Sequence, residues 1–145
     1  MGKLDVEGCI TKLTGFLSDA KASVSREALK ALIPKARLIP LDELERLLTS
    51  NANFHVRRNA LTLILHTEKW RKLPAMLNAC ADGDAKIAGL AARALRDWFF
   101  TCNRSFAEPT RFDFDSIQSV LVKVESKLPH GAAKELRDCM KTYFK

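Results

Sequence analysis

The residues best suited to bind a ligand are lysines and arginines that recur at matching positions in three similar segments. These segments are Val24–Ile33, Val56–Leu65 and Ile87–Arg96. If each segment is a helix, positions two, six and nine after its first residue point away from its apolar side, because successive residues turn by about 100°. Five of these nine positions are basic and none is acidic: Arg26, Lys30, Arg58, Arg93 and Arg96. A row of such cations could bind the phosphates of a nucleic acid.

Two other interpretations of this basic stripe stay open. It could face an acidic protein, or it could be a solvated helix face, since Arg and Lys are good helix formers. Arg57 lies next to the stripe and could widen it. Asp42, Glu43 and Glu45 fall on a different expected helix, and this separation of the charges favours a real basic patch.

A second candidate binding feature is a cluster of aromatic residues around an irregular stretch, residues 101–113. Six of the aromatic residues fall between positions 98 and 114: Trp98, Phe99, Phe100, Phe106, Phe112 and Phe114. Arg104 and Arg111 lie among them, so Arg104, Phe106, Arg111 and Phe112 could stack on bases or anchor a peptide. The other interpretation is a loop that its own phenylalanines hold against the helices, because an exposed cluster of this size promotes aggregation.

Signals for catalysis or metal binding are weak. No two of Cys9, Cys80, Cys102 and Cys139 have the close spacing of zinc ligands, and the three histidines are scattered. The sequence has no Gly-rich phosphate loop, nucleophile elbow or paired-carboxylate motif. We therefore expect a non-enzymatic protein without a metal or cofactor, in which Cys9, Cys80 and Cys139 are buried free thiols.

The elements that position these residues repeat along the chain. An aliphatic residue opens each of the three segments at intervals of 32 and 31 residues, and a short polar turn residue lies five positions earlier. An alanine follows four positions after each opening residue. The matching sets are Asp19, Asn51 and Asp82; Val24, Val56 and Ile87; and Ala28, Ala60 and Ala91. Similar helices at one period are typical of stacked helical repeats.

A second helix is expected before each of these segments. In the first, Leu4–Leu17, we expect one buried stripe made of Val6, Cys9, Ile10, Leu13 and Leu17. Ser23 could cap the segment that follows, and Pro34 should end or kink it. Pro40 should open the helix before Val56, whereas Pro74 should bend the helix before Ile87.

The C-terminal part departs from this repeat. After the irregular stretch 101–113, Asp113 or Asp115 is expected to cap a helix that ends near Pro129-His130-Gly131. Ala132–Phe144 should form the last helix. The two helices, residues 114–145, predict a hairpin that closes the open end of the stack, which solenoid proteins need for solubility.

The pattern resembles the HEAT-like helical repeat family. The turn, aliphatic and alanine sets above carry the resemblance. Arg57-Arg58, directly after Val56, also match a V-R tract that is usual in that family. Ser25-Arg26 matches half of this tract, and Ala88-Gly89 departs from it. The resemblance covers about Leu4 to Phe100. It implies an all-α, right-handed superhelical stack of about three hairpins, with repeats at about 3–38, 40–66 and 68–100, whose inner helices line a concave side.

The resemblance also implies a class of function. HEAT-like stacks are mostly protein-binding scaffolds, some bind nucleic acid, and some are DNA glycosylases for alkylated bases. Asp97 beside Trp98 is the nearby candidate for the last activity, although no motif of those enzymes is present. We expect a scaffold that binds a protein partner, with nucleic-acid binding as the alternative.

Length and charge set the remaining limits. The chain has 145 residues, enough for a single domain, and a net charge of +7, which attracts nucleic acids and acidic proteins alike. No apolar run approaches 20 residues, and the first ten residues lack the apolar core of a signal peptide. We expect a cytoplasmic protein without a membrane partner. The sequence is also compatible with one segment of a larger protein.

Overall fold

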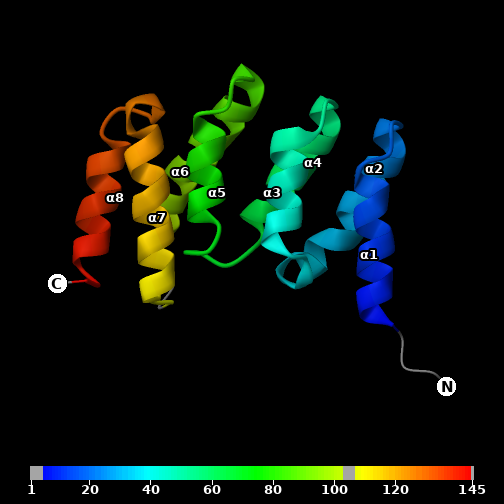
Figure 1. The fold of residues 1–145 in the computed structure, drawn as a ribbon, viewed down its shortest axis with the longest axis horizontal. Helices are drawn as coiled ribbons and strands as arrows, with labels where there is room; N and C mark the ends of the chain where they lie inside the picture. Colours follow the sequence, from blue (N-terminus) through cyan, green and yellow to red (C-terminus); the bar gives the residue numbers. More distant parts are fainter. Residues whose placement is uncertain (1–4, 103–106, 145) are drawn as a thin grey trace. The chain divides into compact units, whose positions relative to one another are not determined.

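The computed structural model describes residues 5–102 and 107–144. Within these residues the protein is all-α, with eight α-helices and no strand (Figure 1). The chain forms two compact units, Met1–Thr67 and Glu68–Lys145, which we call the N-terminal and C-terminal units. Among the described residues, none of the helices combines the length and apolar character that a bilayer span requires.

The N-terminal unit consists of two helical hairpins. The first contains α1 (Val6–Leu17) and α2 (Ala22–Leu32), and the second contains α3 (Leu41–Ser50) and α4 (Phe54–Leu65). A 3₁₀ segment, η1 (Ile33–Leu38), joins them and has Pro34 in its first turn, so Pro34 ends α2 as predicted. Helix α4 contacts α1, α2 and α3, and its side chains supply much of the core.

A chain of buried hydrogen bonds joins the two hairpins. The Asn59 side-chain amide on α4 donates to the Ser25 hydroxyl on α2, with an Nδ2–Oγ distance of 2.8 Å. The Ser25 hydroxyl in turn donates to the carbonyl of Leu17 at the end of α1, over 2.7 Å. Ser25 and Asn59 are 0% and 1% exposed, so these bonds fix which sides of α2 and α4 face each other.

The C-terminal unit contains four helices. They are α5 (Leu73–Cys80), α6 (Ala85–Thr101), α7 (Arg111–Val124) and α8 (Ala132–Lys141), with a 3₁₀ turn, η3 (Glu125–Lys127), after α7. Helix α5 packs against both α6 and α7. An ion pair between Glu125 and Arg137, with an Oε1–Nη1 distance of 2.6 Å, ties α8 to the end of α7.

The three predicted turn residues have the same local structure. The side-chain oxygens of Asp19, Asn51 and Asp82 each accept a hydrogen bond from the backbone N–H two residues later, over 2.8, 2.9 and 2.8 Å. Such turns are a known preference of Asp and Asn. The three alanines of the repeat pattern are buried as well: Ala28, Ala60 and Ala91.

The predicted buried stripe of α1 is only partly correct. Ile10 and Leu17 are buried as expected, but Val6 is 44% exposed and Cys9 is also exposed. Thr14 is buried in their place, and its hydroxyl donates to the carbonyl of Ile10. The apolar side chains of α1 span about 120° around the helix, and α2 and α4 cover the Thr14 side of that arc.

Several predicted helix ends were also wrong. Helix α2 begins at Ala22 without a side-chain cap, so Ser23 lies inside the first turn. Pro74 does not bend α5 but stands in its first turn, where a missing N–H costs no hydrogen bond. Helix α7 begins at Arg111, because Thr110 and Asp113 form a capping box that places Asp113 inside the helix. The expected opening of α3 at Pro40 is confirmed.

Candidate interaction surfaces

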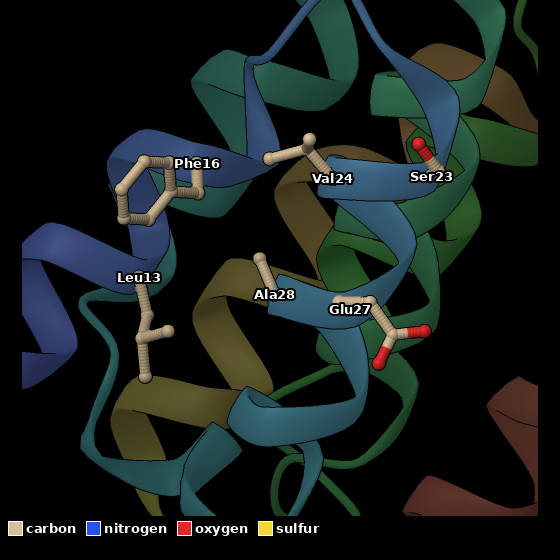
Figure 2. Close-up of a pocket in the computed structure, with 6 residues that line it drawn as sticks. All are labelled: Leu13, Phe16, Ser23, Val24, Glu27 and Ala28. Carbon is tan, nitrogen blue, oxygen red and sulfur yellow. The ribbon is translucent and has the colours of Figure 1, made fainter.

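An apolar groove lies between α1 and α2 on the N-terminal unit (Figure 2). It is open to solvent and has a volume of about 410 Å³. Figure 2 shows Leu13 and Phe16 of α1 and Val24 and Ala28 of α2 around one hollow. Ser23 and Glu27 also line the groove, and in Figure 2 the Glu27 carboxylate points away from Leu13 and Phe16. Phe16 is 52% exposed, so a binding partner could bury much of its aromatic side chain.

The groove exists because α1 carries more apolar surface than its neighbours in the unit cover. Ile10, Thr14 and Leu17 face α2 and α4, whereas Cys9, Leu13 and Phe16 lie at the other end of the apolar arc. The sequence analysis missed this groove because it assigned Cys9 and Leu13 to the core and gave Phe16 no role. The width of the arc gave no warning, because an apolar stripe of about 100° or more is usual for a helix that packs on a core.

Three residues of the predicted basic stripe are exposed on the N-terminal unit. Arg26 and Lys30 lie on α2, and Arg58 lies on α4. The buried hydrogen bond between Ser25 and Asn59 holds α2 and α4 together. Arg26 and Arg58 are the sequence neighbours of these two residues, so they lie on adjacent helices. The Lys30 ammonium pairs with Glu27 over 2.9 Å, and the Arg58 guanidinium lies 6.0 Å from the centre of the Phe54 ring.

Arg57 has a structural contact that the sequence did not suggest. Its Nε donates to the carbonyl of Leu48 over 2.6 Å, in the last turn of α3. A cation at a helix C-terminus binds carbonyls that lack a partner within the helix and interacts favourably with the helix dipole. Arg57 is half-buried, and its guanidinium stabilises the packing of α4 against the end of α3.

The remaining two residues of the stripe belong to the C-terminal unit. Arg93 and Arg96 are exposed on α6. A continuous band across all three helices therefore stays a prediction. Asp97 is exposed on the same helix, whereas Trp98 is 3% exposed and its indole N–H donates to the carbonyl of Lys69 over 2.9 Å. Asp97 and Trp98, considered for a glycosylase activity, therefore lie in different environments: Asp97 faces solvent and Trp98 lies in the core.

Two of the four candidates from the aromatic stretch belong to the described structure, and both are exposed. Arg104 and Phe106 lie outside the described residues. Arg111 and Phe112 are in the first turn of α7 rather than in a loop, and Phe112 is 78% exposed. The Arg111 guanidinium lies 5.2 Å from the centre of the Phe114 ring, and its Nε is 3.4 Å from an Asp115 carboxylate oxygen.

The thiols and imidazoles occupy different environments. Cys80 is buried, and this burial raises its pKa to about 11. Cys9 is exposed, so its predicted burial is wrong, whereas Cys102 and Cys139 are half-buried. His55 is held by a 2.9 Å hydrogen bond between its Nε2 and the carbonyl of Asp19. In the described part of the chain, no three His, Cys, Asp or Glu side chains are grouped to hold a metal ion.

The described fold and surfaces define an all-α protein with an open apolar groove and exposed basic side chains. Comparisons of the chain with models of protein families, with curated proteins and with solved structures find no match. Its function is therefore argued from its own residues.

Proposed function

We propose that the chain is a HEAT-like helical-repeat module that binds an amphipathic helix of a protein partner in the groove between α1 and α2. The repeat assignment is supported by the identical turns at Asp19, Asn51 and Asp82 and by the buried alanine of each following helix. In this proposal the hairpins α1–α2, α3–α4 and α5–α6 stack in order, and α7 and α8 close the stack.

The observation that carries the binding proposal is the exposure of Phe16 beside the groove. A phenylalanine side chain buries roughly 150–250 Å² when it is fully covered. Covering the 52% that is exposed removes roughly 100 Å² of apolar surface from water, which is about 2.5 kcal/mol at ~25 cal/mol per Å². That free energy corresponds to a factor of roughly 50–100 in Kd.

The lining of the groove specifies the chemistry of the partner. Leu13, Phe16, Val24 and Ala28 present apolar surface from two neighbouring helices. A helix with apolar side chains at spacings of three and four residues fits such a surface. Glu27 gives the partner a carboxylate that a lysine or arginine can approach, because its surface pair with Lys30 contributes little stability.

A selection from a library of helical peptides tests this function. The full chain is the bait, and the affinity of each enriched peptide is then measured by fluorescence anisotropy. We expect enriched peptides with an apolar stripe and a flanking basic residue, and at least tenfold weaker binding to Phe16→Asp. Phe112→Asp is the matched control, because Phe112 is also exposed but lies in the C-terminal unit. Peptides that bind Phe16→Asp as tightly as the native chain would exclude the groove.

A second candidate function is the binding of a polyanion such as nucleic acid. It is favoured by the exposed cations Arg26, Lys30 and Arg58 on two helices in contact, and by the net charge of +7. A phosphate-binding surface predicts micromolar affinity for oligonucleotides that falls steeply with salt. The double variant Arg26→Glu/Arg58→Glu should abolish this binding, whereas Arg37→Glu/Arg46→Glu, which lowers the net charge by the same amount, should reduce it only slightly. Equal losses in both variants would show attraction by net charge rather than a defined surface.

A further inference from the structure

Two cysteines that lie far apart in the sequence meet in the C-terminal unit. Cys102 follows the last residue of α6 in helical conformation, and Cys139 lies in the last turns of α8. The Cys102 side chain lies close enough to Cys139 to contribute to the raised pKa of the Cys139 thiol. Both residues are half-buried, so the pair is neither sealed in the core nor fully open to solvent.

A cluster of aromatic rings holds the two helix ends in this position. The Trp70 ring makes edge contacts with Trp98 of α6 and with Tyr143 after α8, and both centroid distances are 5.3 Å. Cys102 lies one helical turn after Trp98, and Cys139 lies one turn before Tyr143. The Trp70 ring therefore brings the end of α6 and the segment after α8 to one place, and each cysteine lies one turn away from a ring that contacts Trp70.

Lys69 places a positive charge beside the pair. Its ammonium donates a hydrogen bond to the carbonyl of Cys102 and lies 4.9 Å from the centre of the Trp70 ring. Burial raises the pKa of the Cys139 thiol, and the neighbouring Cys102 adds to this, whereas the Lys69 charge opposes both effects. A cation stabilises the thiolate, which is the form that attacks disulfides.

We propose that Cys102 and Cys139 form a dithiol modification site, which small-molecule disulfides oxidise to an intramolecular disulfide. In the first step, one cysteine loses its proton, and its thiolate attacks a sulfur of the reagent RSSR to form a mixed disulfide and release RS⁻. In the second step, the other thiolate attacks the protein sulfur of that mixed disulfide and releases a second RS⁻. The two RS⁻ groups take up the two protons, so the protein loses two electrons and the reagent becomes two RSH.

The other two cysteines provide internal controls. Cys80 is buried, and Cys9 is exposed on α1 in the N-terminal unit. Cys9 has the access that a mixed disulfide requires, whereas Cys80 lacks it. Contact between two thiols, rather than exposure of one, is the property that favours the intramolecular product.

The test is to treat the full chain with oxidised glutathione, block the remaining thiols with iodoacetamide and map the peptides by mass spectrometry. We expect a peptide pair linked through Cys102 and Cys139, about 2 Da lighter than the two free peptides because two hydrogens are lost. Cys9→Ser should leave this product unchanged. Cys102→Ser should remove it and leave Cys139 as a stable mixed disulfide with glutathione.

The result can also refute the proposal without any variant. If the native chain accumulates glutathione on Cys102 and Cys139 separately, and no linked pair forms at equilibrium, the thiols do not meet in a geometry that permits a disulfide. Links that involve Cys9 in the same yield as Cys102 would likewise show unspecific oxidation. Far-UV circular dichroism before and after treatment confirms that the reaction occurs in the folded chain.

Discussion

Replacing Ser25 with alanine should destabilise the N-terminal unit by about 2–4 kcal/mol. The Ser25 hydroxyl is 0% exposed and connects two groups, since it accepts from the Asn59 amide and donates to the carbonyl of Leu17. Its removal leaves both groups with one hydrogen bond fewer in a place that is closed to water. An unsatisfied buried polar group costs about 1–3 kcal/mol, and the Leu17 carbonyl at the helix end can recover part of its loss.

A double-mutant cycle separates this network from simple loss of packing. Asn59→Ala alone should cost about 1–3 kcal/mol, because it removes one hydrogen bond and leaves a small cavity. The double variant should cost about 1 kcal/mol less than the sum of the two single changes, since the bond between the two side chains can be lost only once. Thr62→Ala is the control on α4, because its hydroxyl only bonds the carbonyl of Arg58 within the same helix.

Urea unfolding followed by two signals provides the assay. Both tryptophans, Trp70 and Trp98, lie in the C-terminal unit, so their fluorescence reports that unit directly. Far-UV circular dichroism reports the helices of both units. We expect Ser25→Ala to lower the midpoint seen by circular dichroism. A loss below about 0.5 kcal/mol, or strict additivity in the cycle, would refute the account of this buried network.

Three further predictions concern single groups. At pH 8, Cys80 should react slowest of the four thiols with an aromatic disulfide, because burial raises its pKa to about 11; unfolding in urea should remove the difference. The hydrogen bond from Arg137 lowers the pKa of Glu125, so their pair stabilises the fold above the usual carboxyl pKa of 4.5 and loses this effect as the pH falls through the lowered pKa. Unfolding of Glu125→Gln should therefore depend less on pH between 3 and 7 than that of the native chain, as thermal melts can show. Gly131→Ala should cost about 1–2 kcal/mol in urea unfolding, because φ is +80° there, while Gly83→Ala should be nearly neutral.

The helices could be predicted where apolar spacing and helix-end residues agree. Pro40 precedes α3, and Leu44, Leu47 and Leu48 of this helix are buried. A regular apolar stripe beside one strong helix-start signal predicts both the helix and its buried side. Competing signals produced the errors. Pro74 is compatible with either a bend or a first turn, and the expected caps Asp113 and Asp115 both lie inside α7, because Thr110 caps the helix.

The candidate surfaces were less predictable than the helices, because they depend on neighbours that the sequence does not reveal. The exposure of Arg26 and Arg58 follows from a turn of about 100° per residue, which is a local property. The groove beside Phe16 depends on which side of α1 is covered by α2 and α4. The closeness of Cys102 to Cys139 depends on where the ends of α6 and α8 lie, and no local pattern encodes it.

Amide chemical-shift mapping of the full chain with a selected helical peptide tests the central claim most directly. The account predicts that the largest shifts, saturating with the peptide, occur at Leu13, Phe16, Val24 and Ala28, which line the groove. They should disappear in Phe16→Asp. Shifts centred on the exposed face of Arg58, or confined to the C-terminal unit, would contradict a partner helix in the groove between α1 and α2.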